Sequence, residues 1–234
     1  MILTIYIGHD RREPEATKVC RDSLLKHSTV PLHIVELHEP ELRQAGFYDR
    51  PFHLDGNQRI DDRDGKPFST DFSFTRFLVP ALNLYKDWAL FVDADFLFRA
   101  DVAELFALAD DKYAVMCVPH DYRPAETVKM DGQKQELYNR KNWSSLVLFN
   151  CEHPANRFLA CKSVNFMRGG FLHGFNWLRR EQIGPVPEHW NWLEGWSDER
   201  FEPRAVHFTR GIPTMAGYEN APYADEWKEY LSGS

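Results

Sequence analysis

The chain has 234 residues, of which 43% are hydrophobic and 27% charged, and its formal net charge is −7. This composition can bury enough apolar surface for one sizeable core, which argues against intrinsic disorder and favours a single domain spanning residues 1–234. The acidic balance argues against general nucleic-acid binding, because phosphate-backbone affinity needs an excess of Lys and Arg on one face.

The first forty residues are typical of the opening of a parallel α/β sheet. The apolar, β-branched run 2–7 predicts a strand, loop 8–13 follows, and the amphipathic segment 14–26 predicts a helix. A second strand is predicted at 32–37. Strand, helix and strand in this order form a parallel unit, so the loop is expected at the carboxyl edge, where open α/β sheets bind ligands.

The next segment predicts fewer regular elements. Residues 38–68 are polar and carry turn signals, which predicts loop or hairpin. A helix is predicted from Ser69, with Pro80 interrupting or kinking it.

Beyond residue 87 the apolar pattern returns. Strands are predicted at 88–92, 113–118 and 145–149. Asp101 with Glu104 resembles a capping box, which predicts a helix that runs to about residue 109.

Asp93 and Asp95 stand directly after the strand predicted at 88–92. Two carboxylates one residue apart can converge on one cation, and their hard oxygens suit Mg²⁺ or Mn²⁺, which bridge substrate phosphates. A bare Asp-x-Asp more often only caps the following helix or stays solvated. The surrounding string FVDADFLF is apolar on both sides, so the ionised pair needs a partner, and a metal ion supplies one.

In this context the chain resembles the type-A-fold glycosyltransferases, and among them family 8, the glycogenin-like and galactosyltransferase-like enzymes. The resemblance spans nearly the whole chain and rests on these strings in order: IYIGHDRRE, SFTRFLVP, FVDADFLF, NWSSLVLFN and VHFTRGIP. It implies a single, Rossmann-like α/β domain with a mixed, mostly parallel central sheet flanked by helices. Residues 1–118 would form the nucleotide-binding half, and residues 119–234 the half that binds the donor sugar and the acceptor.

The resemblance also implies an activity. It is the transfer of a hexose from a nucleotide sugar, UDP-glucose or UDP-galactose, to an unknown glycan, protein or small-molecule acceptor, with Mn²⁺ or Mg²⁺ bound. The metal ligands would be Asp93, Asp95 and His207, and an imidazole ligand favours Mn²⁺ over Mg²⁺. Contacts to the donor are implied for Ile7, Gly8, His9, Asp10, Arg12, Arg76, Ala94, Arg210 and Gly211.

Some of these positions have simpler interpretations or depart from the family. Loop 8–13 can also serve only to cap the following helix, and Arg76 can be a surface arginine with its stem on Phe72 and Phe77. The family follows its histidine with a glycine and a Lys-Pro-Trp, whereas this chain has Ile212 at the lysine position. Arg210 could take the place of that lysine, and the departure leaves retention of the anomeric configuration open.

The string PVPEHWNWLEGWSDE places three tryptophans beside carboxylates, an arrangement by which proteins hold sugar rings. Trp190, Trp192, Glu194 and Asp198 are therefore candidates for contact with a sugar, although core filling is the commoner role of tryptophan. Glu194 and Asp198 are also candidates for a catalytic base. Ser144 and Ser145 occupy the place where the family carries a polar residue facing the donor sugar.

Three other classes of protein remain alternatives. A phosphatase of the haloacid-dehalogenase type is disfavoured, because its Asp-x-Asp follows the first strand and Leu97 stands where it needs Thr or Val. A sugar nucleotidyltransferase and a non-catalytic sugar- or nucleotide-binding module stay open. The charged insert 119–143 is either a solvated loop or an acceptor site built from Arg123, Lys129, Lys134, Arg140 and Lys141.

The remaining sequence features concern the compartment. The apolar N-terminal run is too short for a signal peptide, and no apolar stretch reaches the length of a bilayer span. The four scattered cysteines favour reduced thiols. A cytoplasmic location is expected.

Overall fold

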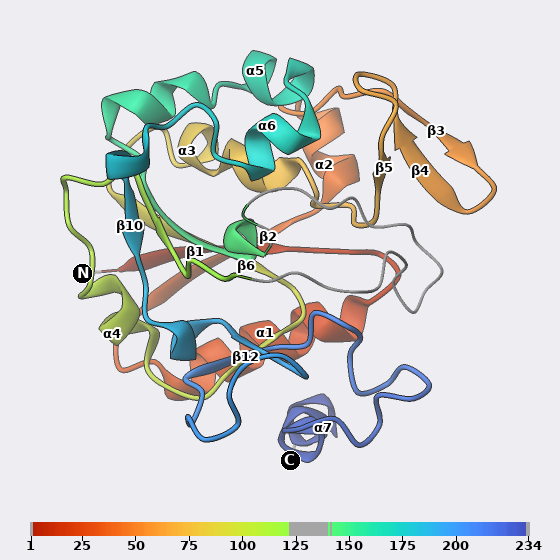
Figure 1. The fold of residues 1–234 in the computed structure, drawn as a ribbon, viewed down its shortest axis with the longest axis vertical. Coiled ribbons are helices and arrows are strands. Elements are labelled where there is room, and N and C mark those ends of the chain that lie inside the picture. Colours follow the sequence, from red (N-terminus) through yellow and green to blue (C-terminus); the bar gives the residue numbers. More distant parts are fainter. Residues whose placement is uncertain (1, 122–139, 141, 233–234) are drawn as a thin grey trace.

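A six-stranded sheet forms the centre of the computed structural model of the protein, which describes residues 2–121, 140 and 142–232 (Figure 1). Its strand order is β10-β8-β9-β6-β1-β2. β1 pairs in parallel with β2 and β6, and β10 with β8, whereas β9 is antiparallel to both of its neighbours. The strands are Leu3–Gly8 (β1), Leu32–Leu37 (β2), Trp88–Asp93 (β6), Val115–Cys117 (β8), Leu146–Asn150 (β9) and Ile183–Pro185 (β10). The predicted mixed, mostly parallel sheet is confirmed.

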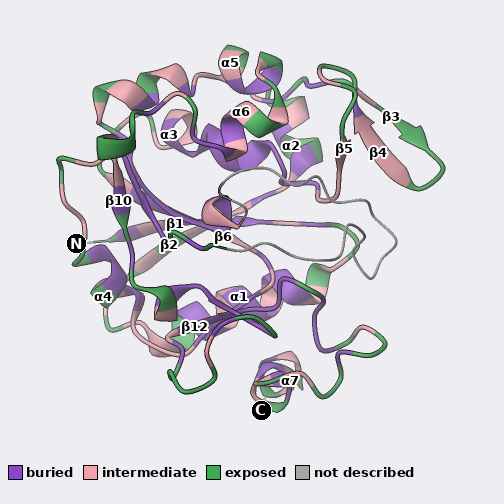
Figure 2. Ribbon diagram, in the orientation of Figure 1, coloured by how far each residue is buried: buried purple, intermediate pink, exposed green. Residues whose placement is uncertain are grey.

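Helices cover both faces of this sheet: α2, α3, α5 and α6 lie on one side, and α1, α4 and α7 on the other (Figure 1). They span Pro14–His27 (α1), Glu39–Gln44 (α2), Val79–Leu82 (α3), Val102–Phe106 (α4), Cys161–Phe166 (α5), Gly169–His173 (α6) and Ala224–Ser232 (α7). Short 3₁₀ helices lie at Thr75–Leu78, Trp143–Ser145, Pro154–Phe158, Arg180–Gln182 and Glu188–Trp190. The central strands are buried along most of their length, and one contiguous hydrophobic core spans the domain (Figure 2).

Two small sheets complete the fold. β7 (Phe96–Phe98), β11 (Trp192–Leu193) and β12 (Ala205–His207) form one, in the order β11-β12-β7. β3 (Phe52–Asp55), β4 (Gln58–Asp61) and β5 (Pro67–Phe68) form the other, whose β3 strand is largely exposed (Figure 2). The predicted loop or hairpin at 38–68 therefore contains this hairpin sheet and, in addition, α2.

The helix predicted from Ser69 is wrong in its extent. The chain makes turns, then the 3₁₀ helix Thr75–Leu78, and only then α3. Pro80 lies in the first turn of α3, where its missing N–H and fixed φ are tolerated, so it opens a helix rather than kinking one. The predicted cap at Asp101 is confirmed, because its carboxylate accepts a hydrogen bond from Ala103 N at 2.9 Å. α4 ends at Phe106, one turn earlier than expected.

Candidate active site

The ends of β1 and β6 meet at the carboxyl edge of the central sheet. Their parallel register places Gly8 beside Asp93, so the first loop and the Asp-x-Asp share one edge, as the sequence predicted. A Cβ at Gly8 would lie 2.5 Å from the Phe72 ring. Only glycine therefore fits where β1 ends.

His207 reaches the same edge from the far end of the sequence. β12 runs antiparallel to β7 with His207 opposite Phe96, and Phe208 N donates to Asp95 O at 2.9 Å. The imidazole stacks on the Phe96 ring, with 4.4 Å between centroids. Its Nε2 lies 3.4 Å from Asp95 Oδ1.

These contacts assemble the predicted metal ligands. One side-chain ligand atom each of Asp93, Asp95 and His207 lies within 4.8 Å of the other two. We call these three residues the metal set. Two carboxylates and one imidazole suit Mn²⁺ by their chemistry, so the residues present fit the ion that the fold implies.

A buried asparagine orients His207. The Nδ1 of His207 lies 3.0 Å from Asn191 Oδ1, and Asn191 Nδ2 donates to Ser145 Oγ at 2.9 Å. Because the amide oxygen can only accept, Nδ1 carries the proton and Nε2 keeps its lone pair. In this tautomer, the nitrogen that faces Asp95 has the lone pair that a metal ligand needs.

Arg76 positions Asp93. Its Nη1 lies 2.8 Å from Asp93 Oδ1 and donates to Ser144 O at 2.8 Å, and the residue is only 6% exposed. The interpretation as a surface arginine is therefore wrong. Ser144 and Ser145 do not face the edge directly: Ser144 holds Arg76, and Ser145 holds Asn191. The 3₁₀ helix Trp143–Ser145 thus positions the Asp93 carboxylate through Arg76 and the His207 imidazole through Asn191.

A pocket opens beside the metal set and encloses about 680 Å³ of space, part of it open to solvent. We call it the edge pocket. It is lined by Asp10, Arg12, Glu13, Ser69, Thr70, Phe72, Asp93, Ala94, Asp95, Asn142, His207, Phe208, Thr209, Arg210, Gly211 and Met215.

Most of the residues predicted to contact the donor line this pocket, but several do not. Ile7 is fully buried in β1, and Gly8 packs on Phe72. His9 and Arg76 point to other partners, His9 to Thr17 and Arg76 to Asp93. The sequence missed lining residues such as Thr70 and Thr209, which carry no motif and come together only through the fold.

Asp10 holds the first loop in place. It is 2% exposed, and its carboxylate accepts from Arg12 Nη2 at 2.8 Å and from Asp71 N at 3.2 Å. Loop 8–13 supplies no side-chain cap to α1. Its Asp10 instead holds the side chain of Arg12, which lines the edge pocket.

Glu194 and Arg210 form the other side of the site. Arg210 Nη1 lies 3.6 Å from Glu194 Oε1, and only Arg210 lines the pocket. Burial raises the pKa of Glu194, and the Arg210 guanidinium offsets part of that rise. Gly195 has φ +70°, and a Cβ there would collide with Arg210 Nη1. The glycine lets the guanidinium lie against the backbone.

Three sequence candidates do not reach the pocket. Trp190 and Trp192 are each 2% exposed, so their predicted role as sugar platforms is wrong and both fill the core. Asp198 pairs with Arg200 at 2.5 Å on the surface, and hydrogen bonds from Arg200 lower the pKa of Asp198 to about 2.

Of the basic residues predicted in the insert, only Arg140 falls within the described part of the chain. Its Nη1 donates to Gly174 O at 2.5 Å. The others, Arg123, Lys129, Lys134 and Lys141, lie outside the described residues. The four cysteines are free thiols, three of them buried.

The architecture is that of known glycosyltransferase structures. The galactosyltransferase LgtC, solved with donor and acceptor sugar analogues, superposes with a TM-score of 0.60 and 12% identity over 99% of this chain and 96% of LgtC. GlyE from Streptococcus pneumoniae TIGR4 gives 0.62 and 13% over 99% of this chain and 60% of GlyE. The bifunctional WbbM gives 0.59 and 13% over 100% of this chain and 50% of WbbM. This chain thus spans about half of WbbM and 60% of GlyE. The fold is the type-A glycosyltransferase fold.

Sequence comparison gives a nearer relative. No family model matches the chain. Protein CDI of Arabidopsis thaliana is 47% identical over 228 residues, which cover 95% of this chain and 83% of that protein. The chain belongs to the family of Protein CDI. Within the described residues, no helix is both long and apolar enough to cross a bilayer.

Proposed function

We infer that this protein is a metal-dependent glycosyltransferase that transfers a hexose from a UDP-sugar, UDP-glucose or UDP-galactose, to a glycan, protein or small-molecule acceptor. The observation that carries the inference is the convergence of Asp93, Asp95 and His207 at the mouth of the edge pocket. The type-A fold supports it. Membership of family 8 remains a prediction from the sequence strings.

The metal set would hold Mn²⁺, or Mg²⁺ in its place. When bound, the ion would supply a Lewis acid that neutralises the diphosphate leaving group. The chain's own part is to hold the ligands ready. Asn191 selects the tautomer of His207 that has its proton on Nδ1, and Arg76 holds the Asp93 carboxylate in place.

Two arginines line the edge pocket together with the metal set. Arg12 comes from the first loop and Arg210 from the segment after His207. Guanidinium groups bind phosphate oxygens bidentately, so both are proposed to hold the diphosphate, with Arg210 in place of the family's lysine. Gly211 lies beside Arg210 in the lining, but its N–H donates to Phe208 O at 3.1 Å, so no phosphate contact is assigned to it. Asp10 acts through Arg12, which it orients.

The candidate catalytic base is Glu194. It lies next to a lining residue, Arg210, and burial raises its pKa above the ordinary value of a glutamate. Asp198 is exposed and ion-paired, so it is dropped as a candidate. The proposed division into a nucleotide half, 1–118, and an acceptor half, 119–234, is consistent with a pocket that draws residues from both.

The test is the release of UDP by purified protein incubated with Mn²⁺ and either UDP-glucose or UDP-galactose, without an acceptor. Slow hydrolysis is expected, and Asp95→Asn should abolish it. Asp225→Asn, on the exposed face of α7, is the matched control and should keep the wild-type rate. Unchanged UDP release in Asp95→Asn would sink the proposal. A sugar nucleotidyltransferase would instead need a nucleoside triphosphate and a sugar phosphate, and a binding module would release nothing.

A further inference from the structure

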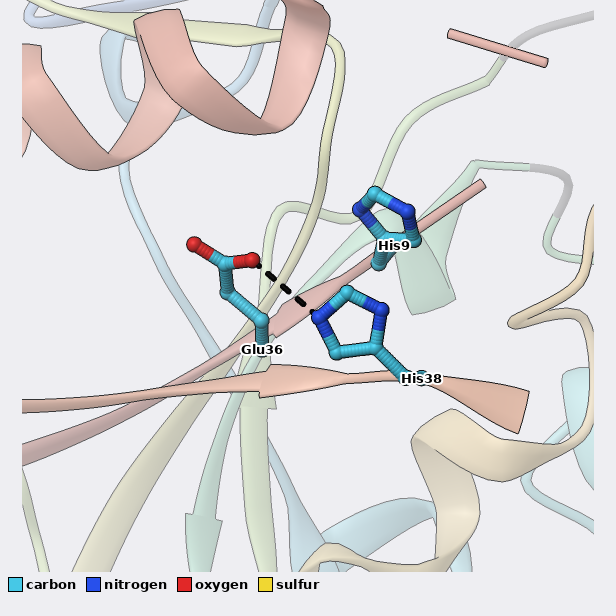
Figure 3. Close-up of side chains that lie close together, drawn as sticks. All are labelled: His9, Glu36 and His38. Carbon is cyan, nitrogen blue, oxygen red and sulfur yellow. Dashed lines mark hydrogen bonds and ion pairs between the residues drawn. The ribbon is translucent and has the colours of Figure 1, made fainter. Parts of the chain in front are cut away.

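A second cluster of ligating side chains lies at the ends of β1 and β2, formed by His9, Glu36 and His38 (Figure 3). We call these residues the His9 cluster. The parallel register pairs Ile7 with Glu36, and His9 N donates to Leu37 O at 3.4 Å, which continues the pairing beyond Gly8. Since side chains alternate along a strand, positions 36 and 38 share a face, and His9 continues that face from Ile7. Three residues of two neighbouring strands therefore point to one spot beside α1.

The ligand atoms of the His9 cluster are as close as those of the metal set. One ligand atom from each residue lies within 4.8 Å of the others. His38 Nε2 lies 3.2 Å from Glu36 Oε2, and the two imidazole rings have centroids 4.1 Å apart at 43°. Two imidazoles this close to one carboxylate can bind the same metal ion.

Two side chains of α1 hold the cluster from behind. His9 Nδ1 lies 3.0 Å from the hydroxyl of Thr17, which is 2% exposed, and Arg21 Nη1 lies 2.8 Å from Glu36 Oε1. These contacts use one nitrogen of His9 and one oxygen of Glu36. Glu36 Oε2 is the oxygen that lies 3.2 Å from His38 Nε2, so it points into the cluster. Such outer contacts are what orient metal ligands in known sites.

The His9 cluster can be reached from solvent. Glu36 and His38 have side chains that are 24% and 30% exposed, so an ion can enter from solvent.

We propose that His9, Glu36 and His38 form a second metal site, which binds Zn²⁺ with three protein ligands and leaves one position for solvent. Two imidazoles and one carboxylate are a zinc ligand set, whereas the two carboxylates and one imidazole of the metal set favour Mn²⁺. The cation ties the end of β1 to the end of β2. It does so one residue before Asp10, the residue that holds the side chain of Arg12.

The test uses Asp95→Asn as the background, because this change removes the metal set and with it the proposed transferase activity. Equilibrium dialysis against Zn²⁺ should give one saturable site per chain. Adding His38→Ala should weaken the affinity of this site for Zn²⁺ by at least about 100-fold. Changes to residues behind the ligands reduce metal affinity by only about 10- to 100-fold. His33→Ala is the matched control: His33 is exposed on the same strand and, by alternation, on the other face from Glu36 and His38.

Co²⁺ adds a structural readout, because its visible spectrum reports nitrogen ligation and coordination number. We expect a low-symmetry, four- or five-coordinate spectrum that Glu36→Gln alters and His38→Ala removes. Circular dichroism of each variant checks that the fold persists. The site does not exist if the Asp95→Asn protein binds no Zn²⁺ saturably, or if His33→Ala and His38→Ala weaken binding equally. Neither result bears on the proposed transfer from a UDP-sugar, because none of the three residues of the His9 cluster belongs to the metal set or lines the edge pocket.

Discussion

Replacing Asn191 with alanine should weaken metal binding at the metal set and also destabilise the fold. Asn191 is fully buried, accepts from His207 Nδ1 at 3.0 Å and donates to Ser145 Oγ at 2.9 Å. In the variant, the imidazole loses the partner that fixes its tautomer. Nε2 can then carry the proton, and that tautomer cannot bind a metal ion.

The magnitude follows from the two lost hydrogen bonds. Each contributes about 1 kcal/mol net, and the buried groups left without a partner add a similar amount, so unfolding should cost about 2–4 kcal/mol less. Second-shell changes at metal sites typically reduce affinity by about 10- to 100-fold. That range corresponds to about 1.4–2.7 kcal/mol of binding free energy.

Asn156→Ala is the matched control for this experiment. Asn156 is equally buried and donates to Ala114 O at 2.7 Å and to Asn150 O at 2.8 Å, on the other end of β9 from Ser145. Urea unfolding should show similar losses for both variants. The Mn²⁺ concentration needed for half-maximal UDP release should rise only in Asn191→Ala. If both variants need the same Mn²⁺ concentration as the wild type, Asn191 has only a structural role and the tautomer argument fails.

Three further predictions follow from the same contacts. Arg76→Met leaves the part-buried Asp93 carboxylate without the Arg76 cation and should lower the free energy of unfolding in urea by about 3 kcal/mol. Added Mn²⁺ should recover part of this loss. An unchanged urea midpoint would contradict the role given to the Arg76–Asp93 pair. Arg210→Ala should reduce the affinity for UDP about 10- to 100-fold in calorimetry, whereas Arg210→Lys should keep part of that affinity. Equal affinities in the wild type and both variants would show that Arg210 does not bind the diphosphate. Burial would raise the pKa of Asp71, but hydrogen bonds from Arg11 and the charges of Arg11 and Arg59 hold the pKa below its ordinary 3.8. The stability that this carboxylate contributes is therefore full above about pH 4 and is lost as the pH falls through the lowered pKa. In an acid titration, the free energy of unfolding of Asp71→Asn should fall less steeply than that of the wild type.

The strands that carry the site were predictable because their apolar runs end abruptly in polar residues. Residues 88–92 lead directly to Asp93, and the first strand ends at Gly8 beside it. The convergence of His207 on the same edge came from the family resemblance alone. No pattern in the sequence says that β12 pairs with β7, because strands of three residues carry too few positions to show a period.

The supporting residues could not be predicted for a different reason. Asn191 and Ser145 act through contacts between segments 46 residues apart, and an asparagine or serine is common in any loop. Trp190 and Trp192 were predicted to face sugars from their spacing beside carboxylates, but the tertiary fold buries both rings. Local sequence cannot tell a sugar platform from core filler, since both need a large apolar ring.

The positions of the three residues of the His9 cluster relative to the predicted strands already indicated that these residues could meet. Glu36 lies on the strand predicted at 32–37 and His38 directly follows it, while His9 lies in the loop after the strand predicted at 2–7. Parallel pairing of these two strands follows from the strand-helix-strand order. That pairing and the alternation of side chains together are enough to bring the three residues to one face of the sheet.

Calorimetric titration with UDP tests most directly whether the edge pocket is a metal-dependent site for a nucleoside diphosphate. UDP should bind the wild-type protein when Mn²⁺ is present and bind far more weakly after chelation. Asp95→Asn should bind UDP weakly in both conditions. Equal binding of UDP by the wild-type protein with and without Mn²⁺, or no binding in either case, would contradict the account.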